Sequence, residues 1–218
     1  MEGSHLGLAR EESLIQNNLD KMRQVAAGAL EGALLALQSQ DVSQAHAVVA
    51  RDTDLNNLYH IVEQECLRAL ALQQPVARDL REIVGSLQVA SELERIGDHA
   101  KDIAKIVMEM DSSDFSGPME HIARMGDLVR TMLDQVMEAV HNKDESLARL
   151  AAAEDSEVDE LDEEAVSGLL MQLMNEPDRT MHSTHLLWIA YHLERIGDRV
   201  KNIAERVVFM VSAETIEL

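Results

Sequence analysis

The feature that most constrains the fold of this 218-residue chain is an internal duplication. The sequence Leu-Glu-Arg-Ile-Gly-Asp occupies Leu93–Asp98 and recurs 100 residues later at Leu193–Asp198. A second pair of segments, Arg51–Asn56 and Glu154–Asp159, is repeated at a nearly equal offset. Self-similarity at a fixed spacing indicates that each half of the chain folds as a copy of one structural unit.

The composition indicates that this unit is helical. Hydrophobic residues make up 46% of the chain but aromatic residues only 2%, so the core consists of Ala, Leu, Ile, Val and Met. Such a core suits closely packed helices better than sheets. Pro75, Pro118 and Pro177 each precede a segment of helical periodicity, as expected for prolines in a first helical turn.

Two more helix starts are indicated by the spacing of a capping box, in Asp41 with Gln44 and in Asn142 with Glu145. These signals together predict an all-α fold of six helices. Long helices joined by short turns lie antiparallel, so each half is expected to form a three-helix bundle. The six helices are predicted near residues 8–39, 42–72, 76–110, 118–141, 144–174 and 179–212.

The boundary between the halves is predicted in the segment Asp111–Gly117, which has the most linker-like composition and lies at the midpoint of the chain. We therefore expect two tandem, pseudo-symmetric domains. The first covers residues 8–112 and the second covers residues 117–213.

A stripe of carboxylates runs along the third predicted helix. Glu94, Asp98 and Asp102 are spaced i, i+4 and i+8, so they share one face of the helix. Like charges at this spacing cost roughly a few tenths of a kcal/mol, which a bound cation would offset. The sixth predicted helix repeats the stripe, with an amide in the last position, as Glu194, Asp198 and Asn202.

The second and fifth predicted helices also carry oxygen-bearing pairs at i, i+4, namely Asp52 with Asn56 and Asp155 with Asp159. Facing helices could therefore combine oxygen ligands around a hard cation. The stripes point away from the apolar face of their helices, which places such a site at the bundle surface. The alternative is a solvated charged face that is screened by salt and by nearby basic residues and binds no metal.

Gly97 and Gly197 interrupt strong helices at equivalent positions, each at a cost of about 1 kcal/mol relative to Ala. They permit either close packing of a neighbouring helix or the exclusion of bulk beside the acids. Histidine ligands are not expected in the acidic sites, because His185 and His192 share a helical face that points away from Glu194.

The charge and cysteine content limit the other functional classes. A formal net charge of −21 repels phosphate backbones, so we expect no nucleic-acid partner. No apolar run approaches the roughly 20 residues needed to span a bilayer, so we expect no direct membrane insertion. The single cysteine, Cys66, cannot form an internal disulfide, and a cytoplasmic location is expected.

The duplicated motifs resemble those of the PhoU family of phosphate-uptake regulators, over about residues 10–213 of this chain. The strongest carriers are Glu94–Asp98, Glu194–Asp198 and Asp155–Asp159. The resemblance implies two PhoU repeats, each a three-helix bundle, in which Glu/Asp-x-x-x-Asp motifs hold metals. The implied ligands are Asp52, Asn56, Glu94, Asp98, Asp102, Asp155, Asp159, Glu194, Asp198 and Asn202.

The implied cofactor is a divalent or multinuclear metal, and the residues do not distinguish iron, zinc, manganese and magnesium. The two copies differ, because Asn56 replaces a family carboxylate and Asn202 stands where the first copy has Asp102. An amide oxygen can bind a hard cation but adds no negative charge. The two sites are therefore expected to differ in affinity or in the number of metals bound.

The resemblance further implies a non-enzymatic, negative regulator of phosphate uptake and phosphate-starvation signalling. Its implied partners are the ATPase subunit of the phosphate ABC transporter and the phosphate sensor histidine kinase, and a homodimer is expected. Two alternatives remain at this stage. One is a structural interaction module without metal; the other is a metal-dependent phosphoesterase, for which the sequence offers no evident catalytic base or oxyanion donor.

Overall fold

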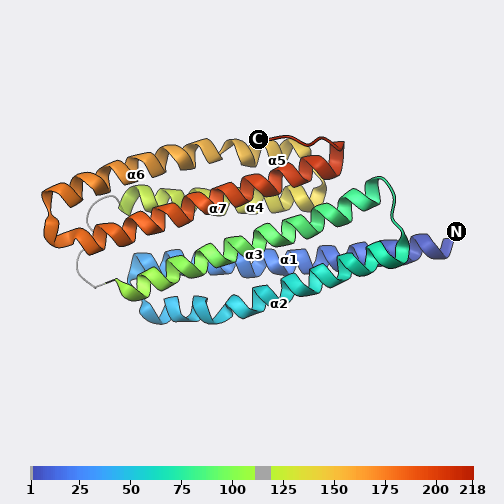
Figure 1. Ribbon diagram of the computed structural model, residues 1–218, viewed down its shortest axis with the longest axis horizontal. Coiled ribbons are helices and arrows are strands. Elements are labelled where there is room, and N and C mark those ends of the chain that lie inside the picture. Colours follow the sequence, from blue (N-terminus) through green and yellow to red (C-terminus); the bar gives the residue numbers. More distant parts are fainter. Residues whose placement is uncertain (1, 111–118) are drawn as a thin grey trace.

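The computed structural model describes residues 2–110 and 119–218, and the side chains of these residues except 2–6 and 177. The described residues contain helices and no strand, which confirms the all-α prediction (Figure 1). The elements are α1 (Glu2–Ser39), α2 (Val42–Gln73), α3 (Arg78–Glu109), α4 (Met119–Asn142), α5 (Glu145–Ala153), α6 (Asp155–Asn175), the 3-10 turn η1 (Pro177–Arg179) and α7 (Thr180–Ser212).

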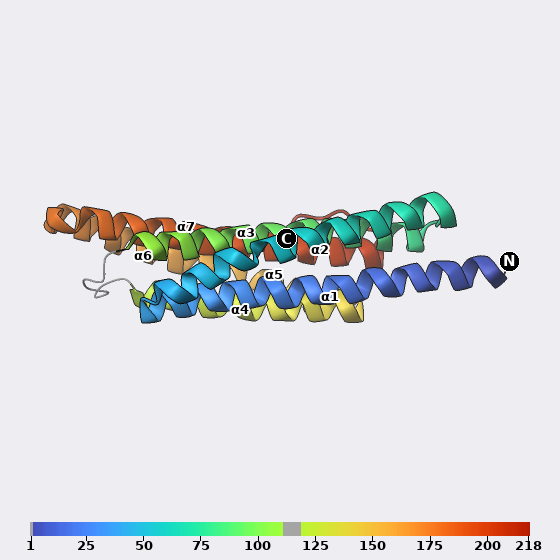
Figure 2. The same cartoon turned by 90° about the horizontal axis from the view of Figure 1, so that it is seen from below.

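The helices form two tandem three-helix bundles, as predicted. The first consists of α1, α2 and α3, and the second of α4, α7 and the consecutive helices α5 and α6. The bundles lie side by side along their length (Figure 1), and α3 packs extensively against α7 across the boundary. Figure 2 shows that α1 and α4 lie together in a second layer, where they also make contact.

The turns that open the two repeats are copies of each other. Gln40 and Lys143 both adopt the left-handed conformation, each with a φ of 54°. The next residue in each case is an N-cap: Asp41 accepts backbone N–H groups of α2, and Asp144 accepts those of α5. The Asp41 cap confirms the prediction. The predicted cap at Asn142 is wrong, because α4 continues through that residue and the carboxylate two positions later meets the free N–H groups.

Two other predicted boundaries differ from the structure. The predicted helix over residues 144–174 is interrupted at Glu154, where the N–H of Glu157 bonds the Glu154 carbonyl in a tighter turn, so that α5 ends and α6 begins. Pro75 lies in the connection before α3 rather than in its first turn, whereas Pro177 opens η1. The predicted helix start at Pro118 lies outside the described residues.

The apolar stripes of α3 and α7 form the centre of the molecule. Leu93 and Ile96 of α3 are fully buried, as are their repeat equivalents Leu193 and Ile196 of α7. One continuous hydrophobic core joins both bundles, because the same two helices contribute to each of them. This packing fixes the rotation of α3 and α7 about their axes and so directs their carboxylates toward the surface. No helix among the described residues is both long enough and apolar enough to cross a membrane.

Candidate metal-binding faces

The first acidic face lies between α2 and α3 and is organised around a lysine. The ammonium group of Lys101 lies 3.0 Å from Oδ1 of Asp52 on α2 and also contacts the carboxylate of Asp98 on its own helix. Asn56 donates a hydrogen bond of 3.3 Å to the other oxygen of Asp52. Three of the predicted ligands thus lie close together, with a basic side chain between them.

Burial and charge perturb the titration of this first face. Burial raises the pKa of Glu94 above its usual value, and the neighbouring Asp98 and Asp52 carboxylates raise it further. Although burial alone lowers the pKa of Lys101, hydrogen bonds to Asp98 and Asp52 raise it overall. Lys101 therefore stays charged and supplies the positive charge that the carboxylates need.

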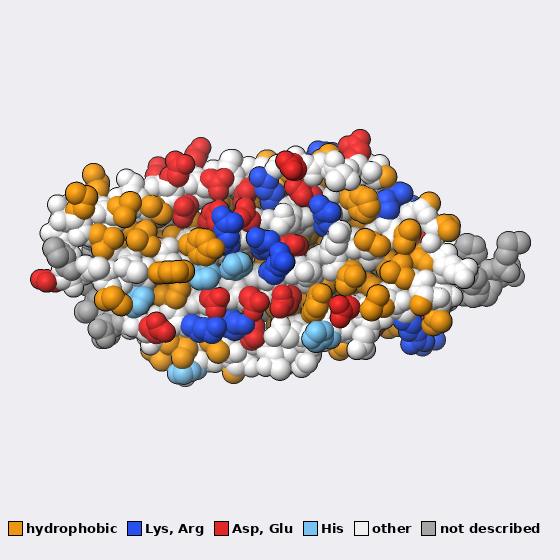
Figure 3. All heavy atoms as spheres, in the orientation of Figure 1, with side chains coloured by type: hydrophobic (Ala, Val, Ile, Leu, Met, Phe, Trp, Pro, Cys, Tyr) orange, Lys and Arg blue, Asp and Glu red, His pale blue; other side chains and the backbone are white. Residues whose placement is uncertain are grey.

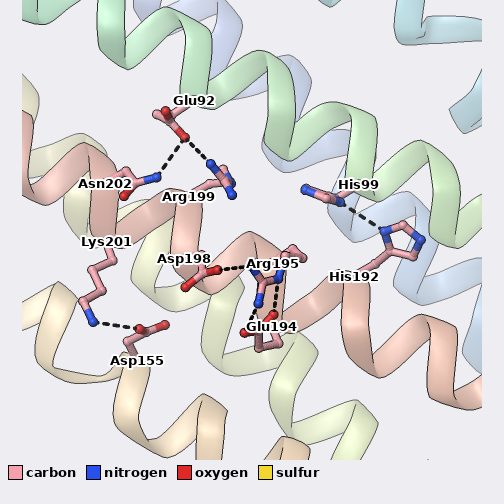
Figure 4. A network of polar contacts seen from close by, with 10 residues as sticks. All are labelled: Glu92, His99, Asp155, His192, Glu194, Arg195, Asp198, Arg199, Lys201 and Asn202. Atoms are coloured by element: carbon pink, nitrogen blue, oxygen red, sulfur yellow. Dashed lines mark hydrogen bonds and ion pairs between the residues drawn. The ribbon is translucent and has the colours of Figure 1, made fainter.

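The second acidic face lies between α6 and α7 and is more deeply buried (Figure 4). Asp155 at the start of α6 is only 5% exposed, and its Oδ2 lies 3.5 Å from the ammonium of Lys201 on α7. Arg195 spans the stripe of α7, with its guanidinium 2.7 Å from Glu194 and 2.9 Å from Asp198. Basic side chains again occupy positions between the acids.

The carboxyl groups of the second face remain incompletely neutralised. Burial raises the pKa of Asp155, and the negative charges of Asp159 and Asp198 add to the shift. Burial likewise raises the pKa of Asp162, followed by repulsion from Asp159. The Oδ1 atom of Asp162 is buried and has no hydrogen-bond partner among the described residues. A buried carboxylate oxygen without a partner is costly, which makes this face the more suitable one for an added cation.

The two equivalent glycines of the hexapeptides serve different neighbours. A Cβ atom at Gly97 would lie 2.1 Å from Cδ2 of Leu55, a core residue of α2. A Cβ atom at Gly197 would instead lie 2.7 Å from Oδ1 of Asp155. The first glycine permits close helix packing, and the second makes room for a buried carboxylate beside α7.

Two predicted ligands point away from these faces. Asn202 donates a hydrogen bond of 3.3 Å to Glu92 of α3, across the repeat boundary (Figure 4). Asp102 pairs with Lys105 on its own helix at 2.8 Å and lies beside a histidine pair described below. The last position of each stripe has therefore rotated from the acidic face toward the contact between α3 and α7.

That contact carries polar groups that sequence reasoning did not assign. Arg199 of α7 lies 3.4 Å from Glu92, and Nδ1 of His192 lies 3.0 Å from Nδ1 of His99 (Figure 4). Burial, followed by the charge of His192, lowers the pKa of His99 to about 4. Burial also lowers the pKa of His192. Both imidazoles are therefore neutral at physiological pH.

The donor chemistry of the acidic faces suits a hard cation, whereas the placement of the donors is closed. Among the described residues, no three histidine, cysteine, aspartate or glutamate side chains converge closely enough to hold a metal ion. Lys101 and Arg195 stand where a cation would provide charge compensation. Figure 3 shows this mixture directly, with basic and acidic side chains side by side over the middle of α3 and α7. A metal would bind by displacing these basic groups from the carboxylates.

One signal in the sequence pointed to the missing basic groups. Lys101 and Lys201 are themselves repeated at the 100-residue spacing, three positions after Asp98 and Asp198. An i, i+3 pair of opposite charge is a local ion pair. The cross-helix partners Asp52 and Glu92 lie far away in sequence, and no local pattern identifies them.

Comparisons with known proteins extend these findings. The described fold and faces define a class of tandem helical-bundle proteins in which two homologous repeats each present a carboxylate face. The PhoU domain family matches residues 19–107 and 122–207, one match for each repeat. The chain belongs to the PhoU family, as its motifs indicated.

Several relatives carry the name phosphate-specific transport system accessory protein PhoU homolog. The protein of that name from Caulobacter vibrioides is 37% identical over 195 residues, which cover 89% of this chain and 85% of the relative. The one from Rhizobium meliloti is 30% identical and covers 97% and 91% of the two chains, respectively. The relatives are thus matched over nearly their whole length.

Solved structures confirm the architecture. The phosphate transport system regulatory protein PhoU from Streptococcus pneumoniae superposes with a TM-score of 0.91 at 28% identity, over 97% of this chain and all of the other. PhoU from Pseudomonas aeruginosa superposes with a TM-score of 0.92, also at 28% identity, over 94% and 99% of the two chains. Both repeats and their mutual packing therefore belong to the shared fold.

Proposed function

We propose that this protein is a cytoplasmic, non-enzymatic regulator that restrains phosphate uptake and phosphate-starvation signalling. The observation that carries the proposal is the match of both repeats to the PhoU family, together with relatives named as accessory proteins of phosphate-specific transport. The regulator would act on the ATPase subunit of a phosphate ABC transporter and on a phosphate sensor histidine kinase, and it would work as a homodimer.

The surface of the molecule supports a role in docking. Large apolar side chains are exposed where α6 meets α7, including Met174 at 84%, Met181 at 68% and Trp188 at 55%. Figure 3 shows apolar side chains gathered at this end of α6 and α7. Exposed apolar groups of this size mark contact surfaces for other proteins. The charge of −21 favours partners that bear basic patches.

The regulatory role is tested by phosphate uptake in cells that lack the gene. Radiolabelled phosphate uptake by phosphate-replete deletion cells should exceed that of the parent strain, and the full-length protein should restore the parental rate. A pull-down with the full-length protein from the same cells should recover the transporter ATPase. Unchanged uptake in the deletion strain would refute the proposed restraint.

We further propose that both acidic faces bind a divalent or multinuclear metal through oxygen ligands. Asp52, Glu94 and Asp98, with the amide of Asn56, would hold it in the first repeat. In the second repeat the ligands would be Asp155, Asp159, Glu194 and Asp198, joined by Asp162. The metal would supply positive charge between α2 and α3 and between α6 and α7, and the orphaned oxygen of Asp162 supports this proposal most directly.

The metal proposal predicts the behaviour of a double variant. Replacement of both Asp98 and Asp198 by Ala should remove the metal that copurifies with the protein, because each repeat loses a central carboxylate. Elemental analysis measures the metal, and thermal melting before and after chelation should show a metal-dependent rise in Tm only in the unmodified protein. Asp134→Ala, at an exposed carboxylate paired with Arg23 outside both faces, is the matched control. Undiminished metal in the double variant would favour the metal-free interaction module.

A further inference from the structure

The contact between α3 and α7 obeys an approximate two-fold relation, because the two helices are repeat equivalents. Arg199 of α7 lies 3.4 Å from Glu92 of α3. Shifting each residue by the 100-residue repeat converts this pair into His99 and His192, whose Nδ1 atoms lie 3.0 Å apart. Figure 4 shows the two contacts as neighbours along the same pair of helices. One is closed by an ion pair, whereas the other consists of two neutral imidazoles.

The third member of each contact completes the comparison. Asn202 donates to Glu92 at 3.3 Å, and its repeat equivalent is Asp102. The Asp102 carboxylate lies close enough to both imidazoles to shift the pKa of each in the same direction. Its ion pair with Lys105 joins two partly exposed side chains, and such pairs contribute only about 0–1 kcal/mol. Asp102 can therefore leave that lysine at little cost.

We propose that His99 and His192 form a binding site for one divalent transition-metal ion that bridges the two repeats, with Asp102 as the third ligand. Two imidazole nitrogens and one carboxylate oxygen suit nickel, copper and zinc, but not magnesium or calcium. This site is independent of the proposed function and differs in chemistry from the all-oxygen ligand sets of the acidic faces.

The separation of the two nitrogens constrains the metal further. With metal–nitrogen bonds of roughly 2.0–2.1 Å, nitrogens 3.0 Å apart subtend an angle of about 91–97° at the metal. That angle matches neighbouring positions in square-planar or octahedral coordination and is narrower than a tetrahedral angle. Copper(II) and nickel(II) prefer such geometries, and copper(II) binds such sites most strongly in the divalent series. Water molecules would fill the remaining positions.

The surroundings allow a cation to enter. His99, Asp102 and Lys105 line a surface cleft that also includes Arg199. The guanidinium of Arg199 faces Glu92, which compensates its charge locally. No basic side chain in the described structure pairs with either imidazole, so metal binding at this site would displace only the exposed Lys105 from Asp102.

The test uses the full-length, metal-stripped protein and copper(II) as the probe. Electron paramagnetic resonance of the protein with one equivalent of copper(II) should show two imidazole nitrogens in the coordination plane. His192→Asn should weaken copper(II) binding by at least about tenfold and leave at most one nitrogen signal from this site. His60→Asn, at an exposed histidine of α2, is the matched control and should leave the spectrum unchanged.

A swap variant separates metal binding from a purely structural role. His99→Arg combined with His192→Glu copies the Arg199–Glu92 contact into the histidine position, so the protein should fold normally by circular dichroism while losing the copper signal. Asp98→Asn combined with Asp198→Asn should retain the two-nitrogen signal even if it abolishes other metal binding. The proposal is overturned if unmodified protein shows no imidazole nitrogens, or if either histidine variant binds copper(II) as tightly as the unmodified protein.

Discussion

At the scale of single residues, the charged side chains are defined by neighbours that lie far away in sequence. Glu12 of α1 illustrates this point, because it approaches Glu82 and Asp79 near the start of α3. Its Oε1 atom is buried without a hydrogen-bond partner among the described residues. Burial, followed by repulsion from these two acids, raises the pKa of Glu12. The ionised form of this residue therefore opposes folding.

Glu12→Gln is expected to stabilise the protein at pH 7 by up to about 1 kcal/mol, after allowance for solvent screening. Because the pKa of Glu12 is higher in the folded than in the unfolded state, the cost is complete above the folded-state value. It disappears as the pH falls through that value toward 4.5, the ordinary pKa of the group. Urea unfolding at pH 7 and pH 4.5 measures this difference. Glu31→Gln, at an exposed residue of α1, should have little effect, and a gap that widens on acidification would contradict the explanation.

At the scale of secondary-structure elements, glycine positions report how closely the helices approach one another. Gly97 lies in α3 against Leu55 of α2, and its missing side chain lets the two helices pack tightly. Gly28 lies in α1 with no atom within 4 Å of the position of an added Cβ. The two residues have the same intrinsic cost in a helix, so only their surroundings differ.

Opposite effects on stability are therefore expected from the same substitution. Gly28→Ala should stabilise the protein by up to about 1 kcal/mol through helix propensity. Gly97→Ala should destabilise it by up to about 2 kcal/mol, because overpacking of roughly 1–3 kcal/mol exceeds that gain. Chemical denaturation of the two variants measures both changes. A shift in the same direction for both would show that α2 moves away from α3 without cost.

At the scale of the whole molecule, the repeats share one core through α3 and α7. A continuous apolar interface couples the unfolding of the parts that it joins. The chain contains one natural probe in each repeat: Cys66 is fully buried in α2, and Trp188 is the single tryptophan and lies on α7. Burial also raises the pKa of the Cys66 thiol to about 12, so it is unreactive in the folded protein.

We expect both repeats to unfold in a single transition. Thiol labelling of Cys66 and fluorescence of Trp188, followed in the same urea series, should give coincident midpoints. Because Cys66 is the single cysteine of the chain, the labelling signal reports the opening of α2 and of no other helix. Labelling of Cys66 at a lower urea concentration than the change at Trp188 would show that the first repeat opens independently.

The sequence by itself determined the duplication, the all-α class, most helix limits and the surface position of the acidic stripes. These properties depend on the helical period and on local capping, as at Asp41, which act over a few residues. The tertiary structure alone decided the partner of each polar group. Asn202 meets Glu92, Asp102 lies beside His99 and His192, and Lys101 reaches Asp52, because these meetings depend on the rotation and axial offset of packed helices. That geometry is set by the whole core, to which residues distant in the chain contribute together.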